Sequence, residues 1–154
     1  MDYLFVKWLH VLSSTILFGT GIGTAFYLLV SSLSRDVALA AGVTRWVVRA
    51  DWLFTATTVV LQPATGLWLA RQAGFPLGAT WLAWSIALYA LAIACWLPVV
   101  WLQMRLRDLA AEAHATGAPL SSRYWIAFRW WFALGVPALG SFLAIFWLMV
   151  ARPA

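Results

Sequence analysis

The chain has 154 residues, of which 64% are hydrophobic and 10% are charged, and its mean hydropathy is +0.87. This apolar share excludes a soluble globular domain of the same length and indicates an integral membrane protein. The net charge of +5 does not indicate nucleic-acid binding, because the arginines flank hydrophobic segments, where they meet anionic lipid headgroups.

Four segments reach the roughly 20 apolar residues that a transmembrane helix needs. They are residues 4–30, 52–70, 81–102 and 125–150. The alternating pattern of a transmembrane β-barrel is absent from the sequence. We therefore predict an all-α, integral membrane four-helix bundle in which residues 1–154 form a single transmembrane domain.

The first segment, 4–30, is predicted to be a retained span and not a signal peptide, because Asp2 stands where a basic region is expected. Within this segment, residues three, four and seven positions apart form one stripe along the helix: Lys7, His10, Ser14 and Gly21. His10 is the only histidine inside a predicted span. A polar imidazole in hydrocarbon is costly unless something binds it, so His10 is the leading candidate for a functional residue.

Residues 31–51 are predicted to be helical, with Ser34 as the cap of a helix that continues into the second span, 52–70. The polar residues of the second span recur every three or four positions and share one face: Asp51, Thr55, Thr58, Gln62 and Thr65. We expect this face to meet the polar stripe of the first span. We also expect Asp51 to form a structural ion pair with Arg49 or Arg129, since a buried charge needs a counter-ion.

The third span, 81–102, is predicted to continue as a helix from Gln103 to His114, with Gly117 as its stop. His114 is expected to be a solvated surface residue, and Cys95, the only cysteine, an inert packing thiol. Three prolines interrupt the spans and are expected to leave kinks that open a cavity for a flat ligand: Pro63, Pro98 and Pro137.

Basic residues are distributed unequally between the two ends of the predicted bundle. Three lie on the side of the termini and of loop 71–80, namely Lys7, Arg71 and Arg152; seven lie on the other side, namely Arg35, Arg45, Arg49, Arg105, Arg107, Arg123 and Arg129. The positive-inside rule then places loops 31–51 and 103–124 in the cytoplasm, with helices two and three extended into it. Both termini are predicted to face the periplasmic side of a bacterial inner membrane, and His10 to lie in the outer half of the bilayer.

Haem b is the leading candidate ligand of His10, because imidazole is a common axial ligand and an apolar helix bundle suits a porphyrin. Lys7, Arg71 or Gln62, near the outer surface, would meet the propionates. Copper is less favoured, since neither Met nor Cys lies beside His10 in the sequence. The alternative without a ligand is a histidine that is hydrogen-bonded to Ser14, Gln62 or a backbone carbonyl.

A second axial histidine is missing from the predicted spans. A bis-histidine site would need a homodimer that contributes two copies of His10. Gly19 and Gly23 form a Gly-x-x-x-Gly pattern that permits close helix approach, either within the bundle or across such a dimer.

The run Phe-Val-Lys-Trp-Leu-His-Val at 5–11, followed by Gly19 and Gly21, resembles the first helix of a family of uncharacterised bacterial integral membrane proteins with four spans. That resemblance covers nearly the whole chain. Residues 3–23 are also similar, more distantly, to HemJ-type protoporphyrinogen oxidases and to CopD-type copper-resistance membrane domains. The HemJ-type resemblance implies a haem b or porphyrin role for His10; the chain differs at 26–29, where Phe-Tyr-Leu-Leu replaces the Arg and His of that family.

The sequence therefore predicts a small inner-membrane protein that binds haem b or a related porphyrin through His10, with an electron-transfer or oxidase-like role. In an oxidase, His10 would hold the iron while Lys7 and Gln62 position the ligand or substrate. The first alternative is a non-enzymatic accessory or assembly subunit packed on a larger membrane complex. The second is an oligomeric transporter.

Overall fold

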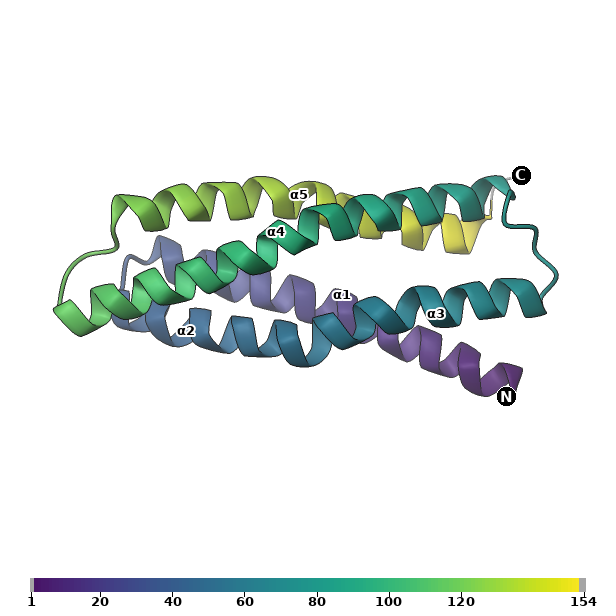
Figure 1. Ribbon diagram of the computed structural model, residues 1–154, viewed down its shortest axis with the longest axis horizontal. Coiled ribbons are helices and arrows are strands. Elements are labelled where there is room, and N and C mark those ends of the chain that lie inside the picture. The colour runs from purple at the N-terminus through teal and green to yellow at the C-terminus, as the bar shows by residue number, and fades with distance from the viewer. Residues whose placement is uncertain (1, 153–154) are drawn as a thin grey trace.

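The computed structural model describes residues 2–152, which form a bundle of long helices (Figure 1). Its elements are α1 (Tyr3–Leu33), α2 (Val37–Ala50), the π-helical turn η1 (Asp51–Thr55), α3 (Ala56–Gln72), α4 (Thr80–Thr116) and α5 (Ser122–Ala151). Because α2, η1 and α3 form one continuous helix, the bundle has four helices, each long and apolar enough to cross a membrane. The described residues contain no strand, so the predicted all-α four-helix fold is confirmed.

Local side-chain and glycine chemistry sets two of the helix ends. Gly117 ends α4 with a φ of +66°, in the left-handed region that glycine adopts without strain, as the sequence predicts. The prediction of Ser34 as the cap of α2 is wrong. The carboxylate of Asp36 accepts the Leu39 N–H at 3.0 Å, so Asp36 is the cap and the helix begins at Val37.

The helices run alternately in opposite directions, so the termini and the α3–α4 loop lie at one end and the α1–α2 and α4–α5 turns at the other (Figure 1). α1 packs against α2, η1 and α3, while α4 packs against α2 and α5. α1 and α5 also touch at two levels. The Ser32 and Tyr124 hydroxyls lie 2.7 Å apart near the turns, and the Phe18 and Phe146 rings meet edge to face at 5.1 Å further along.

The main hydrophobic core lies near the end with the two turns, where Leu28, Leu106 and Ala110 are fully buried. Elsewhere large apolar side chains face outward: Trp147 is 69% exposed and Val150 is 83% exposed. Exposed apolar surface of this extent is typical of a lipid-facing bundle and not of a soluble monomer.

The Gly19–Gly23 pattern does not mediate close helix contact within the chain. A Cβ at either glycine would meet no atom within 4 Å, so neither position requires glycine for packing in the bundle. Contact across a dimer stays a prediction.

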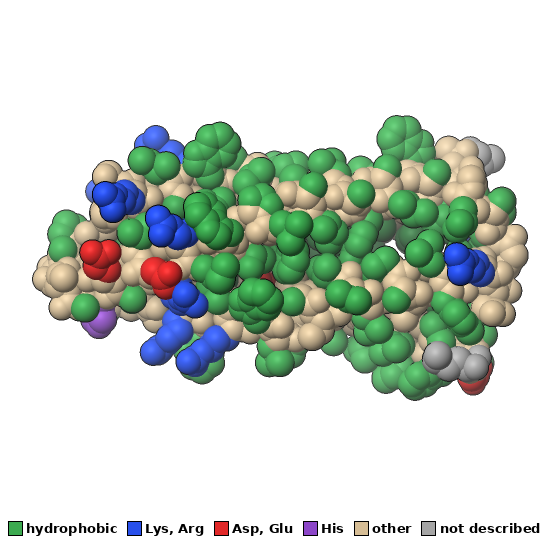
Figure 2. Space-filling view, in the orientation of Figure 1, with side chains coloured by type: hydrophobic (Ala, Val, Ile, Leu, Met, Phe, Trp, Pro, Cys, Tyr) green, Lys and Arg blue, Asp and Glu red, His purple; other side chains and the backbone are tan. Residues whose placement is uncertain are grey.

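Lys and Arg side chains gather at the end of the bundle that carries the two turns (Figure 2). Among residues 2–152 the one ion pair is Arg107–Asp108, at 2.8 Å on the surface. The unequal distribution of Lys and Arg between the two ends agrees with the seven and three basic residues on which the positive-inside argument rests. The orientation that it implies, with periplasmic termini, stays a prediction.

Candidate functional site

The imidazole of His10 is half-buried on α1 and is fixed to α3 by a single side-chain hydrogen bond. Its Nδ1 lies 2.8 Å from Oγ1 of Thr65. The Thr65 hydroxyl donates its one hydrogen within its own helix, to the Leu61 carbonyl at 2.7 Å. In the tautomer with the hydrogen on Nδ1, that hydroxyl accepts from His10 and the Nε2 lone pair is available for a ligand.

Gly66 allows the imidazole to lie this close to α3. A Cβ at position 66 would be 3.1 Å from Cε1 of His10, closer than an ordinary van der Waals contact. Thr65 and Gly66 therefore act together, one orienting the ring and the other making room for it. The sequence places Thr65 on the correct face but provides no signal for Gly66.

Gln62 holds the backbone of α1 at the same level. Its side-chain amide donates to the His10 carbonyl at 2.8 Å and to Oγ of Ser13 at 2.7 Å. The predicted role of Gln62, in which it meets a propionate or a substrate, is not supported by this arrangement, because both hydrogens of its amide group are used within the protein. Ser13, 1% exposed, was not predicted, and Ser14 instead donates to the Val11 carbonyl.

Lys7 and Arg71 are exposed near the end of the bundle that carries the termini. Lys7 is three residues before His10, so the two lie about one helical turn apart on α1. Neither basic residue is brought into hydrogen-bonding contact with the imidazole among the described interactions. Both remain available to a ligand that approaches from the exposed side of His10.

His10 is the ligand-type side chain at this place, and a single imidazole is what a porphyrin site would require of the chain. Across residues 2–152 no group of three His, Cys, Asp or Glu side chains is placed to hold a metal. A porphyrin supplies four nitrogens of its own and needs only an axial ligand from the protein. His10 does not line either of the two described cavities, so the macrocycle would lie against the exposed side of the ring.

Asp51 is buried, 4% exposed, at the first position of the π-helical turn η1. The prediction that it pairs with Arg49 or Arg129 is wrong. Its carboxylate accepts from Oγ1 of Thr55 at 3.0 Å, and Arg129 is exposed on α5. Arg49 precedes Asp51 by two residues, so its side chain points about 200° away from that of Asp51 around the helix. The Arg49 guanidinium lies 4.9 Å from the ring centroid of Trp46 instead.

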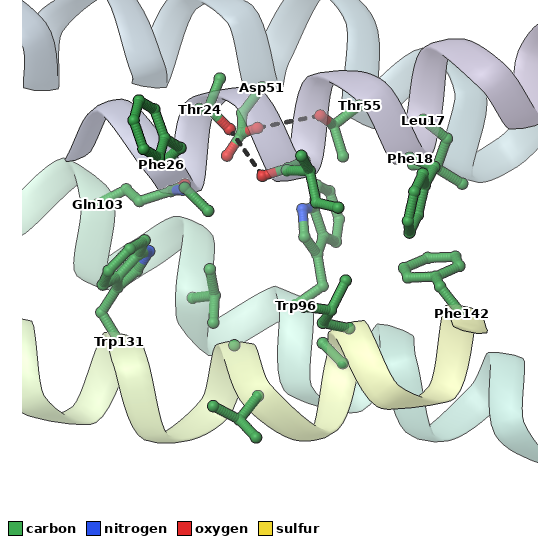
Figure 3. Close-up of a pocket in the computed structure, with 18 of the residues that line it drawn as sticks. Leu17, Phe18, Thr24, Phe26, Asp51, Thr55, Trp96, Gln103, Trp131 and Phe142 are labelled. Atoms are coloured by element: carbon green, nitrogen blue, oxygen red, sulfur yellow. Dashed lines mark hydrogen bonds between the residues drawn. The ribbon is translucent and has the colours of Figure 1, made fainter. Parts of the chain in front are cut away.

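A cavity of about 390 Å³ opens beside Asp51, between α1, η1, α4 and α5 (Figure 3). Residues next to Pro98 and Pro137 line it, whereas those next to Pro63 do not. The expectation that kinks at these prolines open the space stays a prediction. In Figure 3, Asp51 and Gln103 lie at one end of the cavity and Leu17, Phe18 and Phe142 at the other. Phe26 and Trp131 lie at the same end as Asp51 and Gln103, so the polar groups of the cavity stand among aromatic side chains, whereas the other end is apolar.

Two buried polar atoms in the wall of this cavity have no hydrogen-bond partner. They are Oε1 of Gln103 and Nε1 of Trp96. Gln103 is 4% exposed, so its carbonyl oxygen has no access to bulk water. Unpaired buried polar groups are rare in folded proteins, and π-helical turns such as η1 are frequent at functional sites. Neither Gln103 nor Trp96 was predicted as a site residue.

Residues 4–153 match the family described as "Predicted integral membrane protein (DUF2269)", so the chain belongs to this family. The match covers nearly the whole chain and confirms the resemblance to a family of integral membrane proteins. No curated protein and no solved structure matches the chain.

Proposed function

As a member of that family the chain is an integral membrane protein, and we propose that it binds haem b or a related porphyrin through His10. The observation that carries the proposal is the hydrogen bond from His10 Nδ1 to Thr65. Histidines that bind metals commonly donate their second ring N–H to a fixed acceptor, which sets the tautomer and aims the free nitrogen. In the Nδ1–H tautomer, the contact between His10 and Thr65 matches this arrangement.

Three groups on the chain would act on the bound porphyrin. Nε2 of His10 would bind the iron, while Thr65 and Gly66 hold the imidazole in place. Lys7 and Arg71 would meet the propionates at the exposed edge. Haem supplies one-electron chemistry when bound, which corresponds to an electron-transfer or oxidase-like role at the bacterial inner membrane.

A homodimer would complete the site if the iron takes two histidines. His10 is half-buried, so a second copy of the chain has access to this side of the bundle. Trp8, two residues before His10, and Val11, directly after it, are apolar and 58% and 55% exposed. This surface suits either lipid or a second α1 helix.

An absorption spectrum of the purified protein tests the proposal. We expect a Soret band within a window of about 350 to 600 nm, lost in His10→Ala and retained in His114→Ala. His114 is the matched control, because it is the other histidine and is exposed at the end of α4. A colourless wild-type protein that stays colourless after haem is added would refute the proposal. If that colourless protein co-purifies with a larger membrane complex, the accessory-subunit alternative takes its place.

A further inference from the structure

We propose that the cavity beside Asp51 is a binding site for a hydrophobic ammonium ion, an amine in its protonated form that enters from the bilayer. The site is separate from His10 and does not depend on haem. Three features support it: a buried carboxylate without a cation, a second unpaired acceptor, and an apolar, aromatic wall that opens to the lipid-facing surface.

The carboxylate of Asp51 lacks the counter-ion that burial demands. It is 4% exposed, and its hydrogen bonds come from neutral side chains, the Thr55 hydroxyl at 3.0 Å and the amide group of Gln103. The ion pair of the described residues lies elsewhere, between Arg107 and Asp108. Because an ionised group inside a membrane is costly unless paired, and marks a functional site by default, a cationic ligand is the natural partner of Asp51.

The polar end of the cavity offers more acceptors than donors. Gln103, whose Oε1 has no hydrogen-bond partner, lines the cavity together with Asp51, so an ammonium N–H bound there has two candidate acceptors. The unpaired Nε1–H of Trp96 needs an acceptor, which an ether or hydroxyl oxygen on the same amine would provide. A neutral hydrocarbon leaves all three of these groups unpaired.

The rest of the wall suits the apolar body of such an amine. Phe18, Phe142 and Trp131 line the cavity, and aromatic faces attract cations in addition to burying apolar surface. Its volume of about 390 Å³ falls within the range of small-molecule sites.

The cavity reaches the surface between α1 and α5. Some of its lining residues are themselves exposed, for example Phe26 at 58% and Val136 at 56%. The opening lies between the two levels at which α1 and α5 touch, the Ser32–Tyr124 hydrogen bond and the Phe18 ring contact. A ligand dissolved in the bilayer can therefore enter sideways, without crossing the charged end of the bundle.

Equilibrium dialysis of radiolabelled diphenhydramine against the full chain in zwitterionic nanodiscs tests the site. This probe is a tertiary amine with an ether oxygen and two phenyl rings. We expect saturable binding above that of empty nanodiscs, weakened about 30-fold or more in Asp51→Asn and about fivefold in Gln103→Leu. Asp108→Asn is the matched control, because it removes an exposed carboxylate and should leave binding unchanged.

A second pair of variants tests the cavity without touching a polar group. A Cβ at Gly135 or at Gly140 meets no atom within 4 Å, so both positions on α5 accept a larger side chain. Gly135 lines the cavity and Gly140 does not, so Gly135→Leu should block binding while Gly140→Leu leaves it intact.

Three results would overturn the proposal: no saturable binding to the wild type, equal binding to Asp51→Asn, or equal binding of the neutral analogue in which carbon replaces the amine nitrogen. The last result would assign the cavity to neutral lipids or quinols. Soret absorbance of the same nanodiscs is recorded in parallel, so that the haem proposal and the amine proposal fail separately.

Discussion

Replacing Thr65 by valine removes the acceptor of the His10 Nδ1–H while keeping the shape of the side chain. Thr65 is 7% exposed, and the bond that would be lost is 2.8 Å long. An N–H left unpaired in partly buried surroundings costs about 1–3 kcal/mol, which corresponds to roughly 5- to 150-fold in affinity. Haem titration followed at the Soret band should show a weakening of this size, and Thr65→Ser should restore most of the affinity.

Thr58→Val is the matched control for this prediction. Thr58 lies on the same helix and is 5% exposed, but its hydroxyl donates within its own helix, to the carbonyls of Phe54 and Thr55. Its replacement should leave haem affinity unchanged. If Thr65→Val binds haem as tightly as the wild type, or if Thr58→Val weakens binding equally, Thr65 does not orient His10 and the tautomer argument fails.

Three further predictions concern packing and stability. Gly66→Val should displace the His10 ring, because even a Cβ at position 66 would lie 3.1 Å from it. In the same titration haem binding should weaken at least tenfold. Unchanged affinity would show that the ring does not need this space. Ser32→Ala and Tyr124→Phe should each lower the free energy of unfolding in detergent by about 1 kcal/mol, because the two hydroxyls share one hydrogen bond. The double variant should therefore lower it by less than the sum of the two single effects. Additive effects would contradict that hydrogen bond. Asp51→Asn should raise the free energy of unfolding by about 1–3 kcal/mol, since Thr55 keeps an acceptor while the buried charge is removed. A loss of stability would contradict the uncompensated charge at Asp51.

The helices follow from the sequence because their cause is local. Each span is an apolar run long enough to cross a bilayer, and neither its existence nor its helical form depends on what it packs against. The stop of α4 at Gly117 is similarly local, since only the conformational freedom of that residue is involved. The polar spacing also identifies the face of the second span that meets His10, and Thr65 does lie on it.

The partners of the polar residues could not be predicted, because they depend on the register between helices. Arg49 is the exception, because it lies two residues from Asp51 on the same helix and local helix geometry alone already points the two side chains apart. Gln62 lies at the predicted level, but only the packing of α1 on α3 shows that its amide donates to the His10 carbonyl. No sequence pattern identifies Gly66, because its contribution is the missing side chain, which leaves room for the imidazole of His10.

Hydrogen-bond accounting distinguishes the two polar clusters inside the bundle. Around His10, the side chains of Ser13, Gln62 and Thr65 are paired with one another or with backbone, and the Nε2 lone pair is the group left for a ligand. Around Asp51, the charge and two wall atoms lack partners, in a region where lipid offers none. The first cluster is therefore a completed scaffold that presents one coordinating atom, whereas the second is stable only at a cost that a bound cation would remove. If the second cluster served packing alone, Asp51→Asn would make the protein more stable and would cost no ligand binding. The stability of Asp51→Asn and its affinity for the amine, measured together, therefore distinguish a binding site from a cluster without a binding role.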